Sequence, residues 1–173
     1  MVLHVAASWG HYELLPLLWG NGADVNATTS NQETVLHLAS KYGHEYCVSQ
    51  IVTTGANINA ASRVGTTALM YAAANGFLGI TRILINSGAN VNFKDSGSGF
   101  QDDDDNQSPA LVKAALGGHS QVVKLLLRAG AVIDATNWRG ETAWDLAKAY
   151  NHHLTVEVFD LFIQGGMQMV FPV

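Results

Sequence analysis

The chain has 173 residues, of which 48% are hydrophobic and only 13% are charged, against roughly 25% charged residues in an average soluble domain. The formal net charge is −5, most of it from the four aspartates of residues 102–105, and the nine Lys and Arg residues are scattered, which argues against a nucleic-acid-binding surface. The single cysteine excludes an intrachain disulfide, and without a signal-peptide pattern or an apolar run of about 18 residues we expect an intracellular protein, cytoplasmic or nuclear, that does not bind membranes.

A five-residue phrase recurs along the chain at an interval of 33 residues, and its fourth copy arrives nine residues late. The copies are Leu3-His4-Val5-Ala6-Ala7, Leu36-His37-Leu38-Ala39-Ser40, Leu69-Met70-Tyr71-Ala72-Ala73, Leu111-Val112-Lys113-Ala114-Ala115 and Trp144-Asp145-Leu146-Ala147-Lys148. A second phrase follows each of the first four copies: Gly22-Ala23-Asp24-Val25-Asn26, Gly55-Ala56-Asn57-Ile58-Asn59, Gly88-Ala89-Asn90-Val91-Asn92 and Gly130-Ala131-Val132-Ile133-Asp134. Self-similarity of this length predicts a stacked repeat architecture.

One repeat, residues 33–59, shows what each unit should form. Thr34 is a suitable N-cap for a short helix, and Gly43 can end that helix in the left-handed conformation. A second helix then presents one apolar stripe, made of Cys47, Val48, Ile51 and Val52. Gly55 closes the second helix, and an extended loop leads to the next unit. Two short helices cannot bury their apolar faces alone, so we expect neighbouring repeats to bury them for each other.

These phrases resemble the ankyrin repeat family, whose repeat reads Gly-x-Thr-Pro-Leu-His-x-Ala-Ala, then Gly-His, an apolar helix and Gly-Ala-Asp-Val-Asn. Thr34-Val35-Leu36-His37 matches the first part with a substitution, and Gly43-His44 matches the second outright. The resemblance covers nearly the whole chain and implies an all-α solenoid of five stacked helix-turn-helix units with projecting loops. We place an ankyrin domain at residues 1–166, with repeats at about 1–26, 27–59, 60–92, 93–134 and 135–166, and an apolar tail at 167–173.

The outer repeats depart from the family pattern. The first lacks its leading loop, which fits either a piece of a longer array or a trimmed terminal repeat. Pro16 falls inside the second helix of that repeat, where it should remove a backbone hydrogen bond and weaken the helix. In the last repeat the closing glycines come two residues late, and the apolar tail either folds back or marks where more protein follows.

The loop of the fourth repeat is nine residues longer than its counterparts and contains Phe100 and the run Asp102, Asp103, Asp104 and Asp105. Three interpretations remain open: a tolerated insertion, an acidic finger that reaches a basic partner, or a metal site, although the 12-residue calcium-loop pattern is absent. Ser108 and Pro109 should restart the helix, as N-cap and first helical residue.

The histidines and the cysteine are better explained by structure than by chemistry. Six of the seven histidines fall on repeat positions, where the family resemblance implies hydrogen bonds that tie loops and helix starts together. His152 and His153 with Asp160 could form a weak ligand cluster, but no cysteine spacing typical of zinc accompanies them. Cys47 lies on an apolar stripe, and no phosphate-binding or nucleophile motif is present. We expect no metal, no cofactor and no enzyme.

The resemblance places partner binding in a concave groove lined by the loops and the first helices. The residues that we expect to contact a partner protein are Trp9, Asn31, Glu33, Lys41, Tyr42, Arg63, Asn75, Phe100, Asp102 to Asp105, Trp138, Arg139 and Tyr150. Trp, Tyr and Arg are enriched at interface hot spots, whereas Trp19, Trp144 and Phe159 fall on apolar stripes and should belong to the core. The expected function is that of an adaptor, a substrate-recognition arm or an inhibitor, monomeric by itself. The alternative is a regulatory domain of a longer enzyme or channel.

The resemblance also implies a modification. Ankyrin proteins of animal cells can be hydroxylated on the asparagine that ends the Asp-Val-Asn phrase, with a leucine eight residues earlier. Asn26 with Leu18 fits this pattern best, and Asn92 with Leu84 fits next. The competing interpretation is that these asparagines only hydrogen-bond the loop backbone, as asparagine does in turns.

Overall fold

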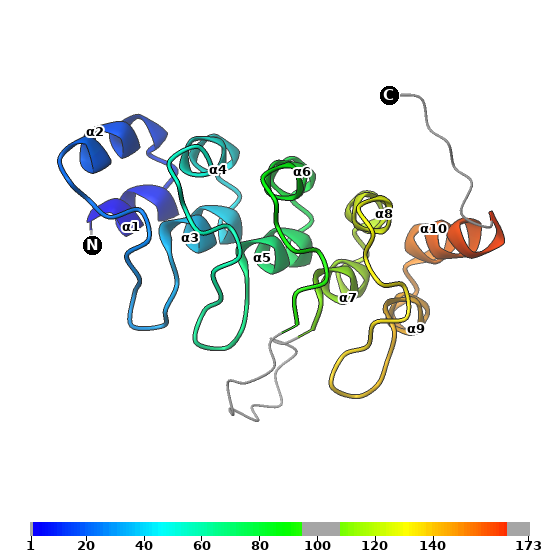
Figure 1. The fold of residues 1–173 in the computed structure, drawn as a ribbon. Coiled ribbons are helices and arrows are strands. Elements are labelled where there is room, and N and C mark those ends of the chain that lie inside the picture. The colour runs from blue at the N-terminus through cyan, green and yellow to red at the C-terminus, as the bar shows by residue number, and fades with distance from the viewer. Residues whose placement is uncertain (1, 95–107, 166–173) are drawn as a thin grey trace.

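The computed structural model describes residues 2–94 and 108–165. Within them the chain forms ten short α-helices and one 3-10 helix, arranged as five successive helical pairs (Figure 1). The first helices of the pairs are α1 (Val2–Ser8), α3 (Val35–Lys41), α5 (Ala68–Ala74), α7 (Ala110–Leu116) and α9 (Ala143–Ala149). The second helices are α2 (Leu15–Gly20), preceded by the 3-10 helix η1 (Tyr12–Leu14), then α4 (Glu45–Ile51), α6 (Leu78–Asn86), α8 (Ser120–Arg128) and α10 (His153–Gln164). This arrangement confirms the predicted all-α solenoid.

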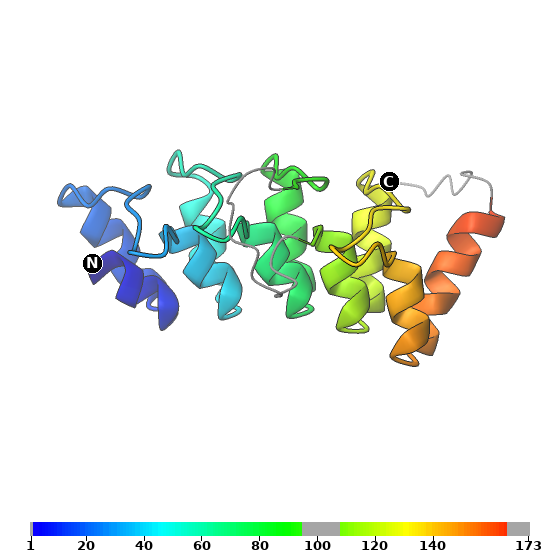
Figure 2. The ribbon, with the colours of Figure 1, turned by 90° about the horizontal axis from the view of Figure 1, so that it is seen from below.

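The helices stack in two rows. Each first helix contacts the next one along the array, and the second row consists of η1 with α2, then α4, α6, α8 and α10 (Figure 1). The loops that lead into α3, α5 and α9 project from the first row, away from the second row, and we call them fingers (Figure 1). Figure 2 shows the first helices running from the fingers to tight turns at the opposite edge. The first helices and the fingers together form one side of the array, which we call the inner face.

Small residues let the first helices approach one another closely. Ala39, Ala72 and Ala114 are fully buried between neighbouring first helices, and Leu36 and Leu111 are 1% exposed. Burying a leucine of this kind contributes about 1.5–3 kcal/mol, and each repeat buries such residues mainly against its neighbours. Stability is therefore shared between adjacent repeats.

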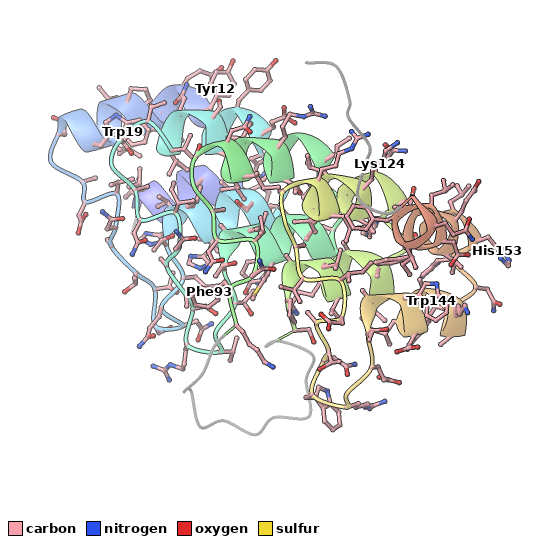
Figure 3. All side chains as sticks on the ribbon, turned by 45° about the vertical axis from the view of Figure 1, so that its right-hand side comes forward. Tyr12, Trp19, Phe93, Lys124, Trp144 and His153 are labelled. Atoms are coloured by element: carbon pink, nitrogen blue, oxygen red, sulfur yellow. The ribbon has the colours of Figure 1, made fainter. Side chains whose placement is uncertain are left out.

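The large aromatic residues of the helix stripes belong to the core, as predicted. Phe159 is fully buried, and Trp19 and Trp144 are partly buried against the core. These two tryptophans lie at opposite ends of the array (Figure 3).

Threonine caps begin three of the first helices. Thr34, Thr67 and Thr142 are extended N-cap residues in capping boxes, in which the side chain three residues later accepts the N-cap amide hydrogen. That partner is His37, Met70 and Asp145 in turn. The hydrogen bonds from Thr142 to the Asp145 carboxylate hold the pKa of that side chain below its usual value.

Two prolines lie differently from the prediction. Pro16 is in the first turn of α2, because α2 begins only at Leu15, after η1. A proline there removes no intrahelical hydrogen bond, so the expected weakening of the helix interior is wrong. Pro109, and not Ser108, is the N-cap of α7, which begins at Ala110. Pro109 thus stands where the second, third and fifth repeats have their capping threonine, and the α7 N-cap makes no side-chain hydrogen bond.

The last helix is longer than its counterparts, with 12 residues in α10 against nine in α8. It buries Thr155 and Phe159 and exposes Leu154, Leu161 and Ile163. Among the described residues, no helix has the length and apolar character needed to cross a membrane. The tail at 167–173 lies outside the described residues.

Candidate functional site

Equivalent residues at the C-terminal ends of the first helices line the edge of the inner face opposite the fingers. They are Trp9, Tyr42, Asn75, Gly117 and Tyr150. The three aromatic side chains are open to solvent, at 72% for Trp9, 52% for Tyr42 and 58% for Tyr150. Tyr150 also stacks on His152, and the Asn75 amide donates to the Tyr71 carbonyl. The structure therefore places these predicted contact residues in one accessible row.

A polar cluster crosses the inner face between the second and third repeats. The Tyr71 hydroxyl donates to Oε1 of Glu33 at 2.8 Å, and Nζ of Lys41 lies 3.5 Å from the same oxygen. The Lys41 ammonium also lies 5.1 Å from the centre of the Tyr71 ring and 5.9 Å from that of Tyr42. Burial, with the hydrogen bond to Glu33, raises the pKa of Tyr71. Glu33 is only 8% exposed, so its carboxylate is turned into this cluster.

The finger tips carry the remaining predicted contacts that the structure describes. Asn31 and Arg63 are both exposed, and the Arg63 amide donates to the Asn31 carbonyl at 2.8 Å, which joins neighbouring tips. Trp138 is 55% exposed, and the Arg139 guanidinium lies 4.6 Å from its ring centre. The Asn137 side chain accepts the Arg139 amide hydrogen at 3.0 Å. The tip that presents Trp138 and Arg139 is therefore held by its own hydrogen bonds.

Phe100 and Asp102 to Asp105 lie outside the described residues. The hypothesis of an acidic finger is therefore carried by the sequence alone.

Three of the repeat histidines hold neighbouring repeats together. The Nε2–H groups of His44, His119 and His152 donate to the carbonyls of Ser8, Ala74 and Leu116, each at the end of the preceding first helix. The third repeat has Phe77 at this position. The Phe77 ring lies close to Gly43, whose φ is +81°. A β-carbon on residue 43 would lie only 2.8 Å from the Phe77 ring and would collide with it.

Asp160, another candidate ligand, is also engaged. Asp160 accepts the indole hydrogen of Trp144 at 3.1 Å, so the suggested cluster with His152 and His153 is divided between two structural contacts. In the described part of the chain, no three His, Cys, Asp or Glu side chains are grouped as metal ligands.

The asparagines that end the second phrase bridge consecutive repeats. Asn26 donates to the Gly55 carbonyl at 3.4 Å and accepts the Asn57 amide hydrogen at 2.8 Å. Asn59 and Asn92 make the same pair of bonds to the next repeat: Asn59 to Gly88 and Asn90, Asn92 to Gly130 and Val132. We call this series the asparagine ladder. It confirms that Asn26 and Asn92 hydrogen-bond the loop backbone, and hydroxylation of either residue stays a prediction.

Sequence reasoning missed two members of these networks. Tyr71 falls on the variable residue inside the phrase Leu69-Met70-Tyr71-Ala72-Ala73 and faces the cluster on the inner face, next to the ring of His37. The sequence does contain a signal for Tyr71, because only the third repeat has a tyrosine at this position of the phrase. Asn59 has Ile51 in place of the leucine of the modification pattern, so that pattern does not mark it, yet it is the central member of the ladder.

Comparisons with known proteins agree with this geometry. The model of ankyrin repeats in three copies matches residues 3–95, and that of a single ankyrin repeat matches residues 106–138. A segment of 43 residues is 51% identical to the human palmitoyltransferase ZDHHC17. That segment is 25% of this chain and 7% of the palmitoyltransferase, so the likeness is local. Ankyrin repeats are in general modules for protein interaction. The matched repeats cover more than half of the sequence, and the chain belongs to the ankyrin repeat family.

Proposed function

We propose that this chain binds a partner protein on its inner face and contributes no catalytic groups of its own. The observation that carries the proposal is the row of exposed aromatic side chains at Trp9, Tyr42 and Tyr150. Aromatic residues of this kind supply much of the binding energy at protein interfaces. Their backbones are fixed by the stacked helices, so little conformational entropy is lost when a partner binds.

The proposal includes the setting in which the module works. It acts inside the cell as a monomer, as an adaptor, a substrate-recognition arm or an inhibitor, and it needs no cofactor. The hydrogen bonds of His44, His119 and His152 support a role without catalysis, because these side chains are already used between repeats. A basic patch on the partner would complement Asp102 to Asp105.

Comparative capture from the native cells tests the proposal. The wild-type chain and a Tyr42→Ala, Trp138→Ala double variant are used as bait at equal concentration, and bound proteins are quantified by mass spectrometry. We expect a specific partner on the wild type that the double variant loses. Tyr46→Ala is the matched control, since Tyr46 is 74% exposed on the second-row helix α4. Partners that bind all three baits equally would contradict binding on the inner face.

A second candidate is the regulatory ankyrin region of a longer protein. The local likeness to a palmitoyltransferase, of which the matching segment is 7%, supports this candidate, because there a similar segment is a small part of an enzyme. Immunoblotting of native cells separates the two. A polypeptide near 18.5 kDa favours the stand-alone module, and a much larger one favours the regulatory region.

A further inference from the structure

The Lys41 ammonium is held in place and yet is open to solvent. Its positions over the Tyr71 and Tyr42 rings, at 5.1 and 5.9 Å, are within the range of cation–π attraction. The side chain is nevertheless 38% exposed. A cation ordered in this way loses little further entropy when it binds an anion.

The acidic neighbour of Lys41 leaves binding capacity on the ammonium. Oε1 of Glu33 accepts the Tyr71 hydroxyl hydrogen at 2.8 Å, whereas Lys41 lies 3.5 Å away. A charge-assisted bond between an ammonium and a carboxylate is usually about 2.7–2.9 Å long. An ammonium has three donors, so Lys41 can donate to a second carboxylate on its exposed side while Glu33 remains buried.

The exposed charge on this part of the inner face is positive. Over residues 2–94, the first helices and fingers carry Lys41 and Arg63 against Asp24 and Glu33, and Glu33 is buried. Glu13, Glu45 and Arg82 lie instead in the second row, on η1, α4 and α6. Over these residues the net charge of the second row is therefore negative, and the net exposed charge of the inner face is positive.

We propose that Trp9, Lys41, Tyr42 and Tyr71, the Lys41 patch, bind a segment of a partner protein that contains Asp or Glu next to an apolar residue. The partner's carboxylate contacts the Lys41 ammonium, and its apolar side chain packs on the Tyr42 and Trp9 rings. This inference rests on the proposed function of the inner face and names the chemistry of the partner at the first three repeats.

Selection of 12-residue random peptides displayed on phage, with the purified chain as target, tests the inference. We expect the selected peptides to be enriched in Asp and Glu beside apolar residues. For one selected peptide, Lys41→Gln should weaken binding by about tenfold or more, which is the loss expected for a hydrogen bond to a charged group. Arg82→Gln removes the same charge from the second-row helix α6 and should leave the affinity unchanged.

Further variants keep the test independent of folding. Glu33→Gln removes the competing carboxylate, keeps the Lys41 cation and should tighten binding of the acidic peptide. A Glu33→Gln, Lys41→Gln double variant leaves no buried charge unpaired and should still lose the peptide. Melting temperatures verify that each variant is folded.

The outcomes separate the two proposals. Peptides that lose binding to Tyr42→Ala but lack acidic residues, or bind Lys41→Gln as tightly as the wild type, would overturn the acidic partner and leave inner-face binding standing. Peptides that bind both Tyr42→Ala and Trp9→Ala unchanged, or a selection that enriches none, would count against both.

Discussion

The Tyr71 hydroxyl of the third repeat donates to the Glu33 carboxylate of the second at 2.8 Å. Glu33 precedes the cap of α3 and Tyr71 lies in the middle of α5, so this bond links a finger to the neighbouring first helix. A finger held in this way is oriented by the next repeat as well as by its own. The inner face therefore depends on pairs of repeats.

Tyr71→Phe should lower the free energy of unfolding by about 1–3 kcal/mol, because a largely buried carboxylate loses its shortest hydrogen bond. Urea unfolding measures this loss. Tyr46→Phe is the control, since Tyr46 is 74% exposed, and it should have little effect. In the Tyr71→Phe background, Glu33→Gln should recover part of the loss. A buried neutral amide without a hydrogen-bond partner costs less free energy than a buried carboxylate without one. If Tyr71→Phe lowers the free energy of unfolding equally in the wild type and in the Glu33→Gln variant, the two residues are not coupled.

His37→Met should reduce the dependence of stability on pH. The Nε2–H group of His37 donates to the Thr66 carbonyl and Nδ1 accepts the Thr34 amide hydrogen, both at 3.0 Å. Burial lowers the pKa of His37, so below the unfolded value of about 6.5 the unfolded chain binds more protons than the folded one. Stability is therefore lost as pH falls from about 6.5 toward the lower folded pKa.

Methionine already occupies the equivalent position in the third repeat, where the Thr67 amide lies 3.5 Å from the Met70 sulfur. The variant should be less stable at pH 7.5, by about 1 kcal/mol for the lost bond to Thr66, and should lose less on acidification. Chemical unfolding at pH 7.5, 6 and 5 measures both effects. The same acid-induced loss in both proteins would exclude His37 as its source.

Asn59→Ala should lower the free energy of unfolding by about 1 kcal/mol or somewhat more. It removes the bonds to the Gly88 carbonyl at 3.1 Å and the Asn90 amide at 2.7 Å, both of which join the second and third repeats. Asn86→Ala, at the end of α6, makes the same chemical change outside the ladder and should shift stability by less than about 0.5 kcal/mol. Thermal and urea unfolding of the two variants give the comparison, and equal effects would mean that the ladder adds nothing to stability.

Trp138→Ala and Tyr42→Ala should each weaken binding of the partner by about 1 kcal/mol or more, the size of a hot-spot loss. Both side chains are more than half exposed, so the melting temperature should change little. Titration calorimetry with the captured partner measures the affinities. If neither variant binds more weakly, the assignment of the inner face is wrong.

Deletion of residues 97–106 should leave stability almost unchanged, because the closure entropy of a loop varies slowly with its length. If the aspartates attract a basic partner, the deletion should slow association at low salt and flatten its salt dependence. Stopped-flow mixing at two salt concentrations measures this. An unchanged association rate at low salt would identify the segment as a tolerated insertion.

Local rules were sufficient to predict the helical pairs and several of their ends. The period of 33 residues located the pairs, and Thr34 and Gly43 behave as expected, with Gly43 at a φ of +81°. Trp9, Tyr42 and Tyr150, expected from the sequence to contact a partner, are also exposed. Each of these features depends on a few adjacent residues and on a repeated pattern.

Features that depend on contacts between two repeats could not be predicted from the sequence. Glu33 belongs to a loop, and only the position of Tyr71 in the next repeat explains why its side chain is turned inward. The late start of α2, which places Pro16 in a first turn, is likewise not indicated by the repeat pattern. Predicting such features requires knowing how neighbouring repeats pack, and the repeat pattern of the sequence does not give this information.

The asparagine ladder keeps its geometry where the sequence does not keep its period. Asn59 reaches the carbonyl of a residue 29 positions ahead, whereas Asn92 reaches its counterpart 38 positions ahead. The nine additional residues therefore leave the bridging contact between consecutive repeats unchanged. Foreign sequence could be inserted at residues 95–107 in the same way. This position could then carry a chosen epitope, sensor or second binding loop on an otherwise unaltered scaffold.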